Sequence, residues 1–226
     1  MRQRRIKDID EKLEGFGFLT VDDPAGERGG WRESFFVPTD RERAGLFLEI
    51  GCGKGTFITR MAEAYPESFF IGAEGNGSVI LRSLEKTAAK RLGNVRFIVD
   101  YVSWLPAIFD DGELDGIFLN FCDPWPKARH AKRRLTHPSY LAQYAQVLAE
   151  GGSVRFKTDN DELFEWSLTQ AEKNAESLGF VISAVTRDLE RSVYFADSPA
   201  SEYEEKFSGA GKNINYFELI KKGPEK

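Results

Sequence analysis

The chain has 226 residues, of which 41% are hydrophobic and 30% charged, and its formal net charge is −5 at pH 7. This balance predicts one globular domain with a sizeable core, and the acidic net charge excludes a protein that coats nucleic acid nonspecifically while permitting a local basic patch. No apolar run approaches the roughly 20 residues of a membrane span and the N-terminus lacks an apolar signal core, so we expect a cytoplasmic protein with no membrane partner.

Residues 1–40 carry little periodic pattern. Glycines and Pro24 interrupt this stretch, and four cations cluster at its start: Arg2, Arg4, Arg5 and Lys7. Such a stretch predicts a flexible N-terminal arm, followed by a single domain over residues 41–226.

From Leu46 onward, short apolar runs alternate with helical stretches. The expected strands are Leu46–Ile50, Phe69–Ala73, Val95–Val99, Leu114–Asn120, Ser153–Thr158, Val181–Thr186 and Ile214–Ile220. The expected helices are Thr56–Ala64, Val79–Arg91, Tyr140–Leu148 and Leu163–Leu178. This alternation predicts an α/β fold with a doubly wound, mostly parallel sheet. Residues 187–213 interrupt it as a long acidic connection, and long loops in compact α/β domains are often functional.

The first expected strand ends in a glycine-rich turn that contains Gly51, Gly53 and Gly55, with Glu49 just ahead of it. Glycines there permit positive φ and a close approach of the backbone to a ligand, although many α/β turns need glycine for geometry alone. The spacing is G-x-G-x-G, whereas dinucleotide folds use G-x-G-x-x-G. An acid beside the turn repels a pyrophosphate but attracts a sulfonium and an ammonium group. The turn therefore favours S-adenosylmethionine over NAD.

Acidic residues follow the next two expected strands. Glu74 ends the second strand about 20 residues beyond the glycine turn, where a ribose-binding acid belongs, although solvated acids are also common at strand ends. Asp100 ends the third strand and can reach the adenine edge, or Tyr101 can stack on the adenine ring. The residues themselves leave that choice open.

A second site is predicted where the fourth expected strand runs into the loop Asn120–Arg134. Asp123 follows the strand directly, where ligands bind in open α/β sheets, and this places it beside the expected methyl group. Pro124 and Pro126 stiffen the chain on both sides of Trp125, which either stacks on a base or fills the core below the loop. An acid, an aromatic ring and cations in one rigid loop predict an enzyme that acts on a nucleic acid base.

Five cations fill the second half of this loop: Lys127, Arg129, Lys132, Arg133 and Arg134. A basic run is often only a solvated face. This one adjoins an expected active-site loop in an acidic protein, so it predicts contacts to RNA phosphates. His130 lies within the run and is expected either to contact RNA or to pack.

Two later acidic segments complete the expected base site. Asp159 follows the fifth expected strand, and Ser201-Glu202-Tyr203-Glu204-Glu205-Lys206-Phe207 lies in the long connection. A carboxylate accepts well from the N1–H and N2–H₂ groups of guanine, and a flipped guanine held by that edge presents N7 elsewhere. Ordinary acidic surface is the alternative, above all for Glu202 and Glu205.

Together these segments resemble the bacterial tRNA (guanine-N7-)-methyltransferases. The resemblance runs from about Leu46 to the C-terminus and rests on residues 48–55, 120–135, 156–160 and 201–207, of which the second segment is highly specific. It implies a Rossmann-like, seven-stranded class I S-adenosylmethionine-dependent methyltransferase fold with an antiparallel last strand. It also implies that the substrate is a guanine in the variable loop of tRNA.

The resemblance extends to individual residues. Those expected to bind the cofactor are Glu49, Gly51, Gly53, Gly55, Glu74, Asp100, Tyr101 and Asp123. Those expected to bind the substrate are Lys127, Asp159, Ser201, Glu202, Tyr203 and Glu204. Those expected to contact the RNA are Arg129, His130, Lys132, Arg133 and Arg134. Asp123 is the expected catalytic residue, as a positioner and not a base, because guanine N7 already carries an in-plane lone pair.

Two positions depart from the family pattern. Gly75-Asn76-Gly77 follow Glu74, where the family usually has bulkier residues, so a looser adenosine pocket is expected. Tyr101-Val102 follow Asp100, where the family usually has alanine after the acid. A shift of one residue would place Tyr101, and not Asp100, at the adenine.

Other interpretations stay open on the residues alone. The Asp-Pro-Trp loop is similar to the (Asn/Asp)-Pro-Pro-aromatic loops of amino-group methylases. A non-catalytic RNA-binding module with a purely structural glycine turn is another alternative, and an NAD-dependent dehydrogenase is a third that the glycine spacing opposes. The oligomeric state, monomer or homodimer, is equally open. Two cysteines and two histidines predict neither a disulfide scaffold nor a metal site.

Overall fold

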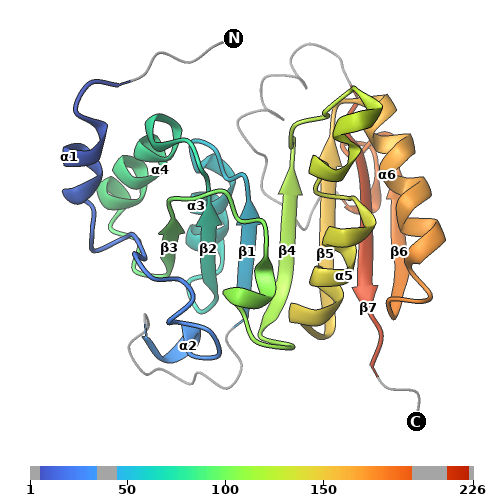
Figure 1. The fold of residues 1–226 in the computed structure, drawn as a ribbon, viewed down its shortest axis with the longest axis horizontal. Coiled ribbons are helices and arrows are strands. Elements are labelled where there is room, and N and C mark those ends of the chain that lie inside the picture. The colour runs from blue at the N-terminus through green and yellow to red at the C-terminus, as the bar shows by residue number, and fades with distance from the viewer. Residues whose placement is uncertain (1–5, 35–44, 195–212, 224–226) are drawn as a thin grey trace. The chain divides into compact units, whose positions relative to one another are not determined.

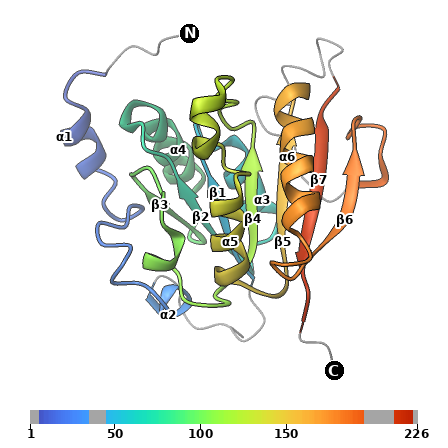
Figure 2. The same ribbon diagram turned by 45° about the vertical axis from the view of Figure 1, so that its right-hand side comes forward.

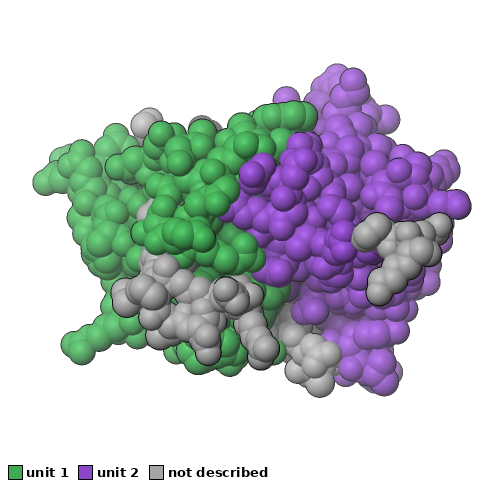
Figure 3. Space-filling model, turned by 90° about the horizontal axis from the view of Figure 1, so that it is seen from below, with its two compact units in different colours: residues 1–109 green, residues 110–226 purple. Residues whose placement is uncertain are grey.

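The computed structural model describes residues 6–34, 45–194 and 213–223. Within them, seven strands form one mixed sheet: β1 Leu46–Ile50, β2 Phe69–Ala73, β3 Val95–Ile98, β4 Leu114–Asn120, β5 Leu148–Thr158, β6 Phe180–Thr186 and β7 Asn215–Lys221. The strand order is β3-β2-β1-β4-β5-β7-β6, and the pairings are mostly parallel (Figure 1). The chain divides into two compact units, residues 1–109 and 110–226 (Figure 3). The α/β class, the seven strands and the antiparallel last strand are as predicted.

Unit 1 contains three parallel strands, with β2 paired to β1 on one side and to β3 on the other. All five residues of β2 are buried, as expected of a parallel strand covered on both faces. Helices α3 (Thr56–Ala64) and α4 (Gly77–Lys90) pack against each other, and α3 also contacts β2 and β3. Each of β1 and β2 therefore leads through a short turn into a helix, and these two turns carry four of the expected cofactor residues, Gly51, Gly53, Gly55 and Glu74.

Unit 2 combines a parallel pair with an antiparallel edge. β4 and β5 run parallel, whereas β7 lies antiparallel between β5 and β6. Helices α5 (Pro138–Val147) and α6 (Asp161–Asn174) contact each other and both contact β5, so they lie side by side on this part of the sheet (Figure 2).

Most predicted bounds hold to within a few residues, and β1, β2, β4 and α3 match them fully. β5 begins at Leu148 instead of Ser153, because the chain passes directly from α5 into extended backbone and Leu148 pairs with Leu114. The end of α6 also differs, at Asn174 instead of Leu178. After this helix, Gly179 has a φ of 73° and the N–H of Phe180 donates to the carbonyl of Ala175. A left-handed glycine with such a hydrogen bond is a common way for a helix to end.

The described part of the predicted arm, residues 6–34, has a defined place in unit 1. Its helix α1 (Ile9–Glu14) packs against α4. Further on, the N–H of Phe97 in β3 donates to the carbonyl of Leu19 (2.8 Å), and the N–H of Val21 donates to the carbonyl of Phe97 (2.9 Å). The segment thus extends the exposed edge of β3. The arm over residues 1–40 and the domain over 41–226 stay a prediction.

Trp31 anchors the end of this segment in helix α2 (Trp31–Ser34). Its ring is fully buried and stacks on Phe109, with ring centroids 5.3 Å apart. Its Nε1–H donates to the carbonyl of Ile108 at 2.9 Å. This packing was not predicted from the sequence. Leu19, Val21 and Trp31 are buried singly, and their spacing does not form one face of a helix.

Within the described ranges, no helix has both the length and the apolar character needed to cross a membrane.

We expect Trp31→Ala to lower the free energy of unfolding by about 3–5 kcal/mol, because the change removes a buried ring and leaves a cavity. Urea denaturation measures this value. Trp104→Ala is the matched control, since Trp104 is 59% exposed and its loss should stay within about 0.5 kcal/mol. An unchanged stability of Trp31→Ala would mean that residues 1–40 are an arm independent of the fold.

Candidate functional site

The glycine turn after β1 is built on left-handed backbone. Gly51, Gly53 and Gly55 have φ values of 77°, 58° and 69°, a region that other residues enter at a cost. A Cβ added at Gly51 would meet no atom within 4 Å, whereas one at Gly55 would lie 2.7 Å from the Cβ of Ser83 in α4. Gly55 therefore serves close packing of α4, and the backbone at Gly51 borders open space that a ligand can occupy.

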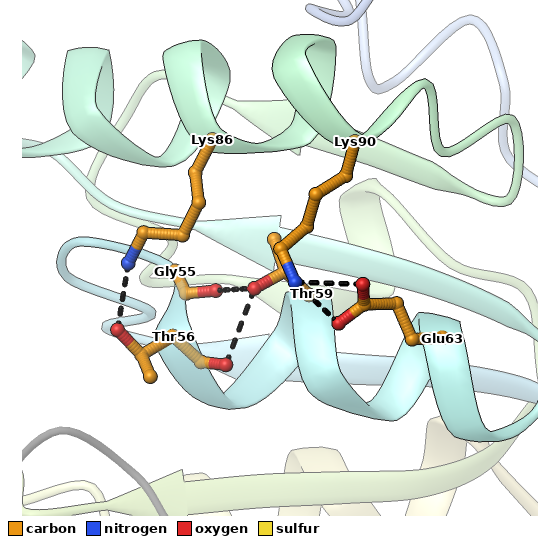
Figure 4. Close-up of polar contacts among 6 residues, drawn as sticks. All are labelled: Gly55, Thr56, Thr59, Glu63, Lys86 and Lys90. Carbon is orange, nitrogen blue, oxygen red and sulfur yellow. Dashed lines mark hydrogen bonds and ion pairs between the residues drawn. The ribbon is translucent and has the colours of Figure 1, made fainter.

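Side chains of α3 and α4 fix the base of this turn (Figure 4). The hydroxyl of Thr59 donates to the carbonyl of Gly55 at 2.7 Å, and Nζ of Lys86 donates to the hydroxyl of Thr56 at 2.7 Å. One turn further along α3, Lys90 pairs with Glu63 at 2.6 Å. The two lysine contacts tie both ends of α3 to α4, and the Thr59 hydroxyl fixes the carbonyl of Gly55 at the start of α3.

Two acids give the turn a negative potential. Glu49 is only 3% exposed. Burial raises the pKa of the neighbouring Cys52 thiol well above its usual value, and the negative charges of Glu49 and Glu74 raise it further. Both carboxylates therefore act on the same point of the turn. A sulfonium or an ammonium group is stabilised there, whereas a pyrophosphate is repelled, so the residues fit S-adenosylmethionine.

Burial also decides the role of the two cysteines. The thiols of Cys52 and Cys122 both have raised pKa values, and burial brings that of Cys122 to about 12. A thiol of this kind is protonated at neutral pH and is a poor nucleophile. In the part of the chain that the structure describes, no three or more His, Cys, Asp or Glu side chains are grouped so that they could hold a metal ion.

At the ends of β2 and β3, the backbone orients two acids. Oε1 of Glu74 accepts from the N–H of Asn76 at 2.8 Å, and Oδ1 of Asp100 accepts from the N–H of Tyr101 at 2.7 Å. The ring of Tyr101 lies directly on Gly75, where an added Cβ would overlap it. The two departures from the family pattern thus belong together, because the missing side chain at position 75 leaves the room that the Tyr101 ring fills.

The loop after β4 leaves the sheet through strained backbone. Among the described residues, four non-glycine residues have positive φ, and two of them lie here: Phe121 at 50° and Trp125 at 41°. The N–H of Phe121 donates to the carbonyl of Lys157 in β5 at 2.9 Å. Between these residues, Asp123 is exposed. The carboxylate therefore lies between two residues with uncommon backbone conformations.

The cations of this loop fall into two groups. Residues 128–133 form a short 3₁₀ helix, and four side chains in and before it are exposed: Lys127, Arg129, Lys132 and Arg133. Within it, Nε–H of Arg129 donates to Nε2 of His130 at 3.3 Å, and the His130 ring meets the edge of Trp125. Arg134 is half-buried, and its guanidinium donates to backbone carbonyls of the loop. The structure thus separates Arg134 from the exposed cations.

The expected base-binding residues are only partly described. Asp159 is half-buried between β5 and α6, next to Asn160, whose side chain caps α6 by accepting from the N–H of Leu163. Ser201, Glu202, Tyr203 and Glu204 lie outside the described residues. The two flanks of their connection meet, since the N–H of Leu189 donates to the carbonyl of Ile214 at 2.9 Å.

A buried cluster at these flanks also touches the loop after β4. It consists of Ala184, Leu189, Ile214 and Tyr216, and Phe121 packs against it. The described flanks of the connection, at Leu189 and Ile214, therefore lie in the same cluster as Phe121, the first residue after β4. Sequence reasoning missed this cluster and also Trp166, which contacts Arg134 from α6. Spacing alone gives no signal for such contacts between distant segments.

Comparisons with known proteins identify the family and the fold of this chain. Residues 43–217 match the family described as "Putative methyltransferase". The tRNA (guanine-N(7)-)-methyltransferase of Geobacillus kaustophilus is 41% identical over 98% of this chain and 97% of that protein, and that of Brevibacillus brevis is 42% identical over 95% of each. The structure of Haemonchus contortus phosphoethanolamine N-methyltransferase 2 in complex with S-adenosyl-L-methionine shares the fold, with a TM-score of 0.52 and 17% identity over 83% of this chain and 50% of that one. The chain belongs to the tRNA (guanine-N(7)-)-methyltransferase family.

Proposed function

We propose that the protein transfers a methyl group from S-adenosylmethionine to N7 of a guanine in the variable loop of tRNA, in the cytoplasm. The observation that carries the proposal is the loop after β4, where an exposed Asp123 lies between two residues of positive φ and is followed by a row of exposed cations. Family membership, at about 41% identity over nearly the full chain, supports the same activity.

Of the expected cofactor residues, all but Asp123 lie in unit 1. S-adenosylmethionine, when bound, supplies an electrophilic methyl group on a sulfonium. We assign the stabilisation of its positive charges to Glu49, and the close backbone approach to Gly51 and Gly53. Glu74, oriented by the N–H of Asn76, is the acceptor for the ribose hydroxyls. The ring of Tyr101 is the wall against which the adenine stacks, with Asp100 holding the Tyr101 backbone.

Guanine N7 needs no base. Its lone pair forms the new bond to the methyl carbon while the electron pair of the C–S bond returns to sulfur, so positive charge moves from the sulfonium to the purine and no proton is exchanged. Positioning of the two reactants then carries the catalysis, and it can contribute about 7–11 kcal/mol. We assign Asp123 to the transfer centre, where its negative charge stabilises the developing positive charge on the purine.

The substrate residues lie in unit 2. Asp159 and the segment Ser201–Glu204 are proposed to accept from the N1–H and N2–H₂ groups of the guanine. The half-buried position of Asp159 supports this, since a carboxylate hydrogen bond is stronger where water is partly excluded. Lys127 and the exposed cations Arg129, Lys132 and Arg133 are proposed to bind tRNA phosphates, with His130 beside them.

We expect Asp159→Asn to lower kcat/KM for unmodified tRNA about 10- to 100-fold, because a charged acceptor of the guanine edge is lost. Incubation with labelled S-adenosylmethionine and nucleoside analysis measures the rate and identifies the methylated atom. Glu162→Gln, an exposed acid three residues along, is the control and should match the wild type. Full turnover by Asp159→Asn would remove Asp159 from the guanine site, and a label on an exocyclic amine would disprove N7 transfer.

We expect Tyr101→Ala to weaken S-adenosylmethionine binding about tenfold, because aromatic stacking on a base contributes about 1–3 kcal/mol. Tyr101→Phe keeps the ring and should bind normally, whereas Gly75→Ala displaces the ring and should resemble Tyr101→Ala. Calorimetric titration measures the Kd, and Trp104→Ala is the control from the same exposed segment. If Asp100→Asn weakens binding and Tyr101→Ala does not, the adenine contact belongs to Asp100.

A further inference from the structure

Arg134 makes three contacts that set it apart from the neighbouring cations. Its Nε–H donates to the carbonyl of Pro124 at 3.0 Å, and its Nη2 donates to the carbonyl of Trp125 at 3.1 Å. Its Cζ lies 4.4 Å from the ring centroid of Trp166 in α6. The guanidinium is thus engaged along one edge by the loop backbone and across its face by an aromatic ring.

The loop needs such contacts because its backbone is strained. A bulky residue at positive φ costs on the order of 1–3 kcal/mol and persists only where its surroundings hold it. Trp125 is such a residue, and Arg134 binds both its carbonyl and the carbonyl just before it. Asp123 directly precedes the first of these two carbonyls, so the contacts of Arg134 determine the course of the chain that follows the carboxylate.

Trp166, which contacts the guanidinium of Arg134, is itself packed against α5. Its ring also stacks with His137 at a centroid distance of 6.4 Å, and His137 caps α5 by accepting from the N–H of Ser139 at 3.2 Å. The residues next to this pair in the sequence also meet, since the hydroxyls of Thr136 and Ser167 are 2.6 Å apart. Arg134 therefore connects the Asp123 loop to the packed pair α5 and α6.

Only an arginine can make this set of contacts. Its planar fork points two N–H groups at two acceptors while its face stacks on a ring, whereas a lysine has one flexible ammonium. Arg133, one residue earlier, shows the contrast: its Cζ lies 4.8 Å from the ring centroid of Trp125, but its side chain is exposed. A charge that only bound phosphate would not require this geometry.

We propose that Arg134 is a positioning residue of the methyl-transfer site: with Trp166, it holds the backbone of Pro124 and Trp125 so that Asp123 keeps its place, and it does not itself bind tRNA phosphate. The inference rests on the proposed function in taking the Asp123 loop as the transfer site. It replaces the expected RNA contact at this one position of the basic run and leaves the exposed cations in that role.

The test compares Arg134→Lys with Lys132→Gln in the full-length protein. Arg134→Lys keeps the charge and removes the fork, so kcat should fall about 10- to 100-fold while the Kd for tRNA and its salt dependence stay unchanged. Lys132→Gln should weaken tRNA binding and reduce the slope of log K against log salt by about one. A normal kcat in Arg134→Lys, or a reduced salt slope in Arg134→Gln, would overturn the proposal.

Two further measurements address the cases in which Arg134→Lys does not fold or the protein does not methylate tRNA. Trp166→Leu removes the stacking plane without changing charge, and a folded variant with full kcat would count against the proposal. Hydrogen exchange of the loop amides should accelerate in Arg134→Lys even without substrates, and unchanged exchange would also count against it. If the wild type does not methylate tRNA, the proposed function fails, whereas the exchange result still decides the role of Arg134 in the loop.

Discussion

Left-handed backbone at the ends of two strands is the constraint on which both candidate sites depend. After β1, the chain meets this constraint with glycines, which adopt positive φ at no steric cost. After β4, it places Phe121 and Trp125 in the same region, and these residues must be held there by other contacts. The N–H of Phe121 is bound to β5, and the carbonyl of Trp125 is bound to Arg134. One site is thus shaped by the absence of side chains and the other by side chains that hold the backbone.

The same contrast appears in the charges. The glycine turn is acidic, with a buried Glu49 whose charge helps to raise the pKa of Cys52. The loop after β4 is basic, with exposed lysines and arginines that water and salt can reach. A buried acid acts strongly on a small cation at short range, whereas exposed cations bind a long polyanion through many weak, screened contacts. A net charge of −5 is therefore compatible with a protein that binds both S-adenosylmethionine and tRNA.

How far the sequence predicts the structure depends on the range of each interaction. Strand periods and the glycine turn are local, and Leu46–Ile50, Phe69–Ala73 and Leu114–Asn120 were predicted with their observed bounds. The anchoring of Trp31 beneath Phe109 was not, because a single apolar residue shows no period. Arg134 looked like its neighbours in the basic run, because neither its hydrogen bonds to the carbonyls of Pro124 and Trp125 nor its contact with the distant Trp166 can be recognised in the sequence. In the sequence, Gly75 and Tyr101 are two separate departures from the family pattern. In the structure they are in contact, because the Tyr101 ring lies on Gly75.

The chemistry of guanine N7 explains why rigidity matters more than proton transfer here. A reaction that exchanges no proton has no use for a group with a tuned pKa, so the available free energy lies in alignment and in stabilising the charge that reaches the purine. The role that we propose for Asp123 requires a carboxylate whose backbone does not move. A loop stiffened by Pro124 and Pro126 and fixed through Arg134 to α6 meets that requirement better than a mobile loop carrying the same acid. The cost of an aromatic residue at positive φ is then understandable, because the strained conformation directs the loop and the guanidinium keeps it there.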